Sequence, residues 1–97
     1  MQTYILLMKL TEQGIKDIRN APKRIDLATQ SLEAMGGKMI AFYAVMGEYD
    51  YVVIGEVPSD EVAMKFLLGL GAVGNVRTTT LKAFTREEFV RALEKMP

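Results

Sequence analysis

Four runs of apolar and β-branched residues indicate four β-strands in this 97-residue chain. They cover residues 3–10, 38–46, 49–57 and 76–84. Helical periodicity fills the gap between the first and second runs and the gap between the third and fourth. The resulting order contains two βαβ units, whose crossovers are right-handed. It predicts an α+β, ferredoxin-like βαββαβ fold, in which a four-stranded antiparallel sheet carries both helices on one face.

Helix-start and helix-stop residues bound the helical stretches. Asn20 is expected to cap the first clear helix, which ends at Gly36. Ser59 opens the second helix and precedes two acidic residues, which favour the positive end of a helix dipole. After the last strand, Thr85 and Glu88 form a capping-box pattern. This pattern predicts a short C-terminal helix.

Residues 69–74 match the letters of the dinucleotide-binding fingerprint, Gly-x-Gly-x-x-Gly. That fingerprint works between a strand and the start of a helix, where backbone N–H groups meet a pyrophosphate. Here it follows a helix and precedes a strand, so the helix dipole has the opposite sense. We therefore interpret Gly69, Gly71 and Gly74 as residues that end the second helix.

Gly47-Glu48 separates the second and third strands. Glycine at the first central position is typical of a type II′ hairpin turn. A two-residue turn would pair Ala44 with Tyr51 and Phe42 with Val53 across the ladder. A slip of one residue would move every side chain to the other face of the sheet.

Both faces of the predicted sheet carry apolar side chains. The first strand places Ile5 and Leu7 on one face and Leu6 on the other. A sheet with helices on one side only is expected to be polar on its open side. An open face of about 19 by 23 Å would reach the roughly 300–600 Å² limit for apolar patches on soluble monomers. We therefore predict a homodimer that packs sheet to sheet, with edge pairing as the route to larger homo-oligomers.

The chain contains no cysteine and no histidine. Disulfides, thiolate metal sites and nucleophiles activated by histidine are therefore excluded. We expect no cofactor and no metal site. Any chemistry would use carboxylates, lysine, tyrosine, arginine or backbone groups.

Charge and hydropathy restrict the partners. Twelve basic residues balance twelve acidic ones, which argues against nucleic acid as a partner. Arg24 belongs to a basic group interleaved with Asp17 and Asp26, a pattern typical of a solvated helix face. No apolar run approaches the ~20 residues that cross a membrane, and no signal peptide is apparent at the N-terminus. We therefore expect cytoplasmic residence without membrane contact.

Three segments resemble the GYD domain family. Gly47-Glu48-Tyr49-Asp50 carries the Gly-x-Tyr-Asp signature, residues 11–15 follow the first strand, and residues 74–80 lead into the last strand. The resemblance implies one ferredoxin-like domain of the dimeric α/β-barrel type over residues 1–97. It implies little about activity, because related dimeric barrels include cofactor-independent monooxygenases, haem-degrading enzymes and ligand-sensing domains.

Six polar residues are candidates for a ligand site. They are Tyr43, Tyr49, Asp50, Tyr51, Arg77 and Thr79. Asp50 would act as a base if burial raised its pKa, or it would accept backbone hydrogen bonds at the hairpin. Arg77 would anchor a carboxylate or phosphate in a cleft, or it would be an ordinary strand residue like Thr79.

These residues predict a homodimeric domain that binds a small organic molecule in a sensory or accessory role. One alternative is a monooxygenase- or isomerase-like enzyme without metal or histidine, in which Asp50 abstracts a proton. A second alternative is a purely structural assembly module. A pocket where Asp50 and Arg77 converge would favour binding or catalysis, whereas a seam filled with side chains would favour assembly.

Overall fold

Four strands and four helices follow one another in the computed structural model, which describes residues 1–97. The strands are β1 (Gln2–Leu10), β2 (Lys38–Ala44), β3 (Tyr51–Val57) and β4 (Val76–Ala83). The helices are α1 (Glu12–Lys16), α2 (Ala21–Ala34), α3 (Asp60–Val73) and α4 (Arg86–Glu94), with a 3₁₀ turn, η1 (Ile18–Asn20), before α2. The predicted order of strands and helices is confirmed.

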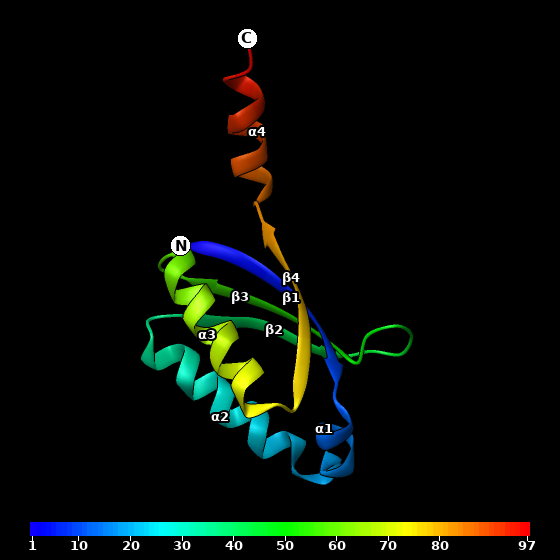
Figure 1. Cartoon of the computed structure of the whole chain (residues 1–97). Coiled ribbons are helices and arrows are strands. Elements are labelled where there is room, and N and C mark those ends of the chain that lie inside the picture. Colours follow the sequence, from blue (N-terminus) through cyan, green and yellow to red (C-terminus); the bar gives the residue numbers. More distant parts are fainter.

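The strands form one sheet in the order β2-β3-β1-β4, and all neighbours are antiparallel. Helices α2 and α3 lie on one face of this sheet (Figure 1). This is the predicted ferredoxin-like α+β arrangement. The predicted hairpin register is also confirmed, because Phe42 pairs with Val53 and Ala44 pairs with Tyr51.

The core between the helices and the sheet is thin. Only nine of the 97 residues are buried. One cluster joins Leu6, Met8 and Val53 on the two central strands. A second cluster joins α2, β3 and α3 through Leu32, Val57 and Ala63. The two clusters are connected only through half-buried residues that contact both, such as Phe66.

The opposite face of the sheet carries the alternate side chains. Because Leu6 and Met8 are buried toward the helices, Ile5 and Leu7 point to the open face. Leu81 pairs with Ile5 and is exposed. The open face is therefore largely apolar, as the sequence predicts. No helix of the chain covers it (Figure 1).

The connection between β2 and β3 is longer than the predicted two-residue turn. The strands end at Ala44 and restart at Tyr51, so residues 45–50 form the loop. The backbone N–H of Val45 donates to the carbonyl of Asp50 at 2.9 Å and closes the loop. Gly47 has φ 118°, a conformation that favours glycine. The register survives because hydrophobic pairing fixes it independently of loop length.

Two helix predictions are wrong in detail. Helix α3 continues through Gly69 and Gly71 and ends at Gly74, which adopts the left-handed conformation with φ 88°. The two interior glycines cost about 1 kcal/mol each in helix propensity, and packing of the helix onto the sheet outweighs that cost. Asn20 precedes α2 but its side chain makes no capping bond. It donates instead to the carboxylate of Asp17 at 2.6 Å.

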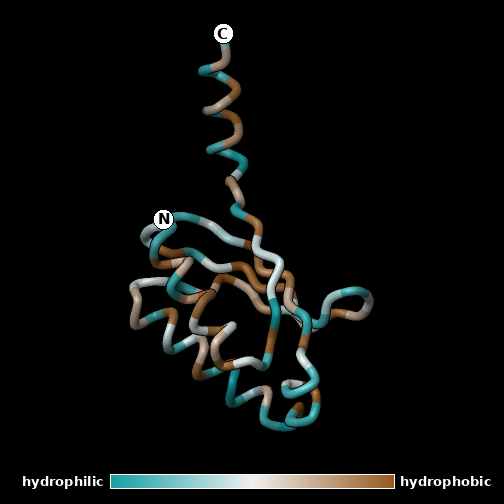
Figure 2. The backbone as a smooth tube through the Cα atoms, in the orientation of Figure 1, coloured by the Kyte–Doolittle hydropathy of each residue, from teal (hydrophilic) through white to brown (hydrophobic).

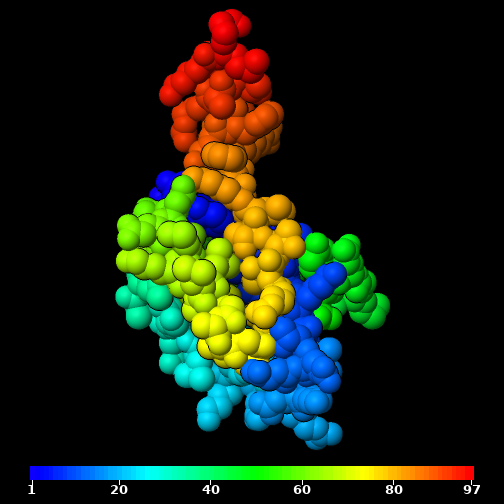
Figure 3. All heavy atoms as spheres, viewed as in Figure 1, coloured from blue at the N-terminus to red at the C-terminus, as the bar shows by residue number.

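Helix α4 stands apart from the rest of the molecule. It continues in the direction of β4 beyond the end of the sheet (Figures 1 and 3), and the chain measures 52 Å along its longest axis. The predicted capping box is confirmed, since Glu88 and Thr85 each accept a hydrogen bond from the backbone of the other. Apolar and polar residues alternate around the helix (Figure 2). No helix of the chain is both long and apolar enough to cross a membrane.

Candidate functional site

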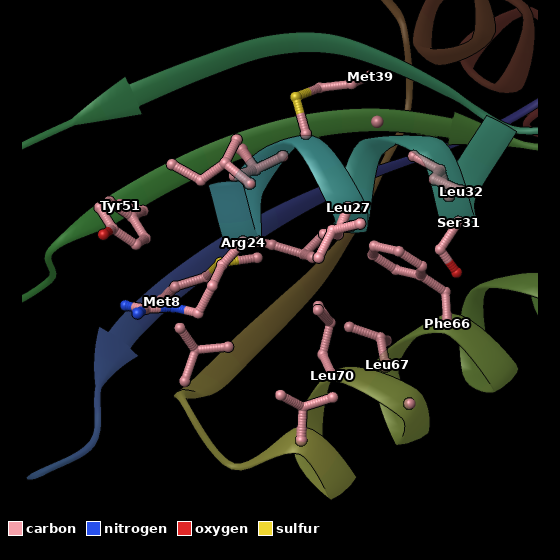
Figure 4. A pocket seen from close by; sticks show the side chains of 18 of the residues that line it. Met8, Arg24, Leu27, Ser31, Leu32, Met39, Tyr51, Phe66, Leu67 and Leu70 are labelled. Carbon is pink, nitrogen blue, oxygen red and sulfur yellow. The ribbon is translucent and has the colours of Figure 1, made fainter. Parts of the chain in front are cut away.

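A cavity lies between α2, α3 and the helix-covered face of the sheet. Its volume is about 440 Å³, and 21 of its 27 lining residues are hydrophobic. Figure 4 shows Phe66, Leu67 and Leu70 of α3 facing Leu27 and Leu32 of α2 across this space. Ligand pockets in proteins are typically about 300–1,000 Å³ and mostly apolar, with a few polar groups. The cavity has the size and lining of such a pocket.

One end of the cavity carries polar groups. The guanidinium of Arg24 and the phenol of Tyr51 both lie there (Figure 4). Arg24 donates through Nη1 to the Asp17 carbonyl at 2.6 Å and to its carboxylate at 3.3 Å, and through Nη2 to the Gly14 carbonyl at 3.1 Å. A guanidinium has five N–H donors, so at least two remain without a partner in the chain. The Arg24 side chain is 20% exposed, which corrects its interpretation as part of a solvated helix face.

The signature loop closes the same end of the sheet. The carboxylate of Asp50 accepts a hydrogen bond from the backbone N–H of Leu10 at 2.8 Å. The backbone N–H of Asp50 donates to the carbonyl of Met8, also at 2.8 Å. These two bonds extend the β1–β3 pairing beyond Tyr51. Asp50 therefore fixes the β2–β3 loop against the end of β1.

The two other segments of the family resemblance meet each other beside this loop. Thr11 Oγ1 donates to the Gly74 carbonyl at 2.6 Å, and the Thr11 backbone N–H donates to the Asn75 carbonyl at 3.0 Å. Thr11 also caps α1, because its hydroxyl accepts from Gly14 N at 3.1 Å. Gln13 donates to the Val73 carbonyl at 3.1 Å. The exit from β1 and the turn from α3 into β4 are thus held together.

A charged cluster adjoins the cavity wall at Tyr4. Tyr4 lies on the cavity wall, and its hydroxyl donates to the carboxylate of Asp60 at the start of α3. Lys82 Nζ lies 3.0 Å from the same carboxylate. The hydrogen bond to Asp60, together with desolvation and the negative charge nearby, raises the pKa of Tyr4 from 10.0 to about 12. The bonds from Tyr4 and Lys82 lower the pKa of Asp60.

The six predicted site residues do not gather in one place. Tyr51 lines the cavity and its ring lies 5.0 Å from that of Phe42. Tyr43 and Thr79 pair with Val52 and Leu7, so they lie on the open face of the sheet. Both side chains belong to exposed residues.

The charged candidates are also separated from one another. Arg77 pairs with Lys9 on the sheet and donates weakly to the Gly71 carbonyl at 3.4 Å. No hydrogen bond or salt bridge joins it to Asp50. Tyr49 is half-buried beneath Lys9, whose Nζ lies 5.5 Å from the ring centroid. No group of three or more acidic residues is placed to hold a metal ion.

Sequence reasoning missed the polar residues Tyr4 and Arg24 on the cavity wall, and Asp60 and Lys82, which join Tyr4 in one cluster. Tyr4 offered a partial signal, since alternation places it on the same face as Leu6. The pairing of Asp60 with Lys82 joins residues 22 positions apart, at the start of α3 and near the end of β4. Local sequence spacing does not reveal a contact over that separation.

Comparison with known proteins identifies the family. The GYD domain matches residues 4–93. This chain belongs to the GYD domain family. The geometry above gives the GYD signature a structural role, since Gly47 permits the loop and Asp50 binds it to β1.

A relative and a structural neighbour add context. A protein of Thermus thermophilus is 34% identical over 95 residues, which are 97% of this chain and all of that protein. It is described as a glutamine synthetase and cystathionine beta-lyase binding protein. The feast or famine regulatory protein of M. tuberculosis, solved with L-methionine, superposes with a TM-score of 0.66 at 19% identity over 88% of this chain. This chain spans about half (51%) of that regulator, and at 19% identity the likeness shows the fold alone.

Proposed function

We propose that residues 1–97 form a homodimeric domain that binds an apolar small molecule in the cavity and serves as an accessory to another protein. The observation that carries the proposal is the cavity of about 440 Å³ with its hydrophobic lining. Empty apolar space costs stability, because the side chains around it lose dispersion contacts. A ligand that fills the space restores those contacts.

The polar groups define the class of ligand. The cavity offers apolar surface along its length and unpaired N–H donors of Arg24 at one end, beside the hydroxyl of Tyr51. An arginine with free donors pairs well with a carboxylate. A compound with an apolar body and one terminal carboxylate therefore fits better than a sugar, a nucleotide or a free amino acid.

The open face of the sheet supports the proposed homodimer. Ile5, Leu7 and Leu81 lie there with no cover from the chain's own helices. A second sheet packed against this face would remove it from water, in the manner of sheet-on-sheet packing at about 10 Å. Light scattering is expected to give a mass near twice 10.8 kDa at micromolar concentration. A monomer mass would contradict this part of the proposal.

The accessory role is supported by the Thermus thermophilus relative, whose description names two enzymes that it binds. A small domain that binds both a ligand and an enzyme would report on metabolite level through a protein contact. No specific observation favours the enzyme alternative for this chain, since the carboxylate of Asp50 already bonds Leu10 and lies apart from Arg77.

Calorimetric titration with decanoic acid tests the cavity. Leu70 faces the cavity (Figure 4) and Leu68 is 67% exposed on the outer side of the same helix. We expect Leu70→Trp to fill the space and weaken binding at least tenfold, and Leu68→Trp to bind like the wild type. Decanol in place of decanoic acid is expected to bind more weakly because it lacks the charge that pairs with Arg24. Equal affinity of all three proteins for decanoic acid would place the ligand elsewhere.

A further inference from the structure

The cavity is closed at one end by Leu32 of α2, Val57 of β3 and Ala63 of α3. All three residues line the cavity, are buried and pack together in one cluster. Leu27 of α2 and Val73 of α3 also line the cavity, but both are exposed. The cavity is therefore closed where the two helices meet at Ala63, and it opens to solvent between Leu27 and Val73.

The side chain of Leu32 fixes the position of this closed end, because it lies directly against the backbone of two glycines. A Cβ at Gly37 would lie 2.8 Å from Leu32 Cδ1, and a Cβ at Gly55 would lie 3.8 Å from Leu32 Cδ2. Glycine within a strand often marks the close approach of another group to the backbone. On β3 that group is the Leu32 side chain. The space above the sheet therefore ends over Gly55 and Val57.

Hydrogen bonds hold the start of α3 on the sheet at the same end. Tyr4 pairs with Gly55 in the sheet, and its hydroxyl donates to the carboxylate of Asp60 in the first turn of α3. Lys82 Nζ on β4 lies 3.0 Å from that carboxylate. These contacts join the first turn of α3 to β1 and β4, one turn before Ala63. Widening the closed end would require breaking them.

The positively charged group lies at the opposite end. Figure 4 shows Arg24 and Tyr51 together on one side of the cavity and Leu32 on the other. Two elements give the distance between the ends. Tyr51 and Gly55 are four positions apart on β3, which is about 13 Å in an extended strand. Arg24 and Leu32 are eight positions apart on α2, which is about 12 Å in an α-helix.

We infer that the cavity selects linear carboxylates of about ten carbons, with the carboxylate at Arg24 and the last carbon against Leu32 and Ala63. The inference rests on the ligand binding proposed above, and it adds an orientation and a length limit. An extended alkyl chain advances about 1.3 Å per carbon, because its C–C bonds of roughly 1.5 Å alternate in direction. A space of about 12–13 Å therefore takes about ten carbons. Further carbons would meet the closed end.

This arrangement predicts a break in the dependence of affinity on chain length. Each CH₂ group buried on the way to Leu32 is expected to tighten binding about fourfold. From hexanoic to decanoic acid, the dissociation constant should thus fall on the order of a hundredfold. Dodecanoic and tetradecanoic acid should gain nothing further, because their additional carbons find no space beyond Leu32. Calorimetric titration measures the series, with each acid below the concentration at which it forms micelles.

Two substitutions at the closed end should move the break in opposite directions. Ala63→Leu places a larger side chain in the end and should make octanoic acid the best ligand. Leu32→Ala uncovers Gly55 and should make dodecanoic acid the best ligand. Hexanoic acid is too short to reach the end, so both variants should bind it like the wild type. Ala72→Leu is the matched control for Ala63→Leu, because Ala72 is exposed on the same helix and lies outside the cavity lining; it should leave the series unchanged.

Each outcome decides a separate question. If no acid of the series binds the wild type, both the proposed ligand site and this inference are wrong. If the acids bind but their affinity shows no break up to tetradecanoic acid, the ligand site stands and the length limit is overturned. Equal losses of affinity for hexanoic and decanoic acid in Ala63→Leu, with an unchanged circular dichroism spectrum, would also overturn it. The wild-type series decides the question alone if a variant does not fold.

Discussion

Replacing Gly14 with alanine should destabilise the fold, because the new methyl group would collide with backbone. A Cβ at position 14 would lie 2.2 Å from the carbonyl oxygen of Asn75 and 3.1 Å from a methyl group of Leu10. The Asn75 oxygen already accepts the backbone N–H of Thr11 at 3.0 Å, so it cannot retreat without weakening that bond. Overpacking of this kind costs about 1–3 kcal/mol, and a weakened hydrogen bond adds up to about 1 kcal/mol.

The helix preference of alanine works in the opposite direction. Alanine is favoured over glycine in a helix by about 1 kcal/mol, which offsets part of the collision. When the hydrogen bond is lost in full, its cost of about 1 kcal/mol cancels the helix preference, and the net loss for Gly14→Ala is about 1–3 kcal/mol. Each kcal/mol lowers the midpoint of thermal unfolding by about 4–8 °C in a domain of this size. Gly69→Ala is the matched control, since no atom lies within 4 Å of its new Cβ. It should gain up to about 1 kcal/mol.

Urea unfolding followed by circular dichroism measures both variants. Protein concentration is held constant, because dimerisation makes apparent stability depend on it. The expected pattern is opposite signs for the same chemical change at two helical glycines. If Gly14→Ala were as stable as the wild type, the contact between α1 and the turn into β4 would not have the closeness described above.

Two further predictions concern polar groups. Asp50→Ala should lower the free energy of unfolding by about 1–3 kcal/mol, because it leaves the N–H of Leu10 without an acceptor. The control Glu48→Ala, at an exposed neighbour, should lower it by under about 0.5 kcal/mol. Equal losses for the two variants in urea unfolding would contradict the role of Asp50. For Tyr4, the pKa raised to about 12 means that its bond to Asp60 stabilises the fold fully below pH 10 and is lost as pH rises through about 12. The pKa of Tyr4 is measured as the difference between the absorbance titrations at 295 nm of the wild type and Tyr4→Phe. In an Asp60→Asn background, this pKa should move toward 10.0. An unchanged pKa would rule out Asp60 as the cause.

The sheet could be predicted because its signals are local and repeat. Alternation with period two places Leu6 and Val53 on the same face, and burial of that face fixes the register of the hairpin. The loop could not be predicted in the same way. Asp50 bonds to the end of β1, a partner 40 residues away, and this contact draws the chain out of the ladder before the expected turn.

The sequence allows a ligand between the helices and the sheet, but it could not show that a cavity exists there. Leu27 of α2 and Leu70 of α3 face each other across the interior. Whether two facing side chains touch or leave a space depends on how far the helices stand from the sheet, which no local pattern encodes. Arg24 could not be recognised from sequence for a similar reason. It lies among basic and acidic residues typical of a solvated helix face, but its side chain is only 20% exposed.

The GYD signature contacts residues that also line the proposed ligand site. Asp50 holds the end of β1 at Leu10, and Thr11 holds the turn at Asn75; Leu10 and Asn75 also line the cavity at its polar end. A substitution in the signature would therefore alter both the stability of the fold and the shape of the cavity mouth.

Loss of ligand affinity in an Asp50 variant would not by itself make Asp50 a ligand-binding residue. Arg24 supplies the positively charged donors at that end. Arg24→Gln therefore separates the two effects, because it removes the charge while it keeps a polar side chain at the mouth. A loss of affinity for decanoic acid without a matching loss for decanol is the result that a change in stability alone would not produce.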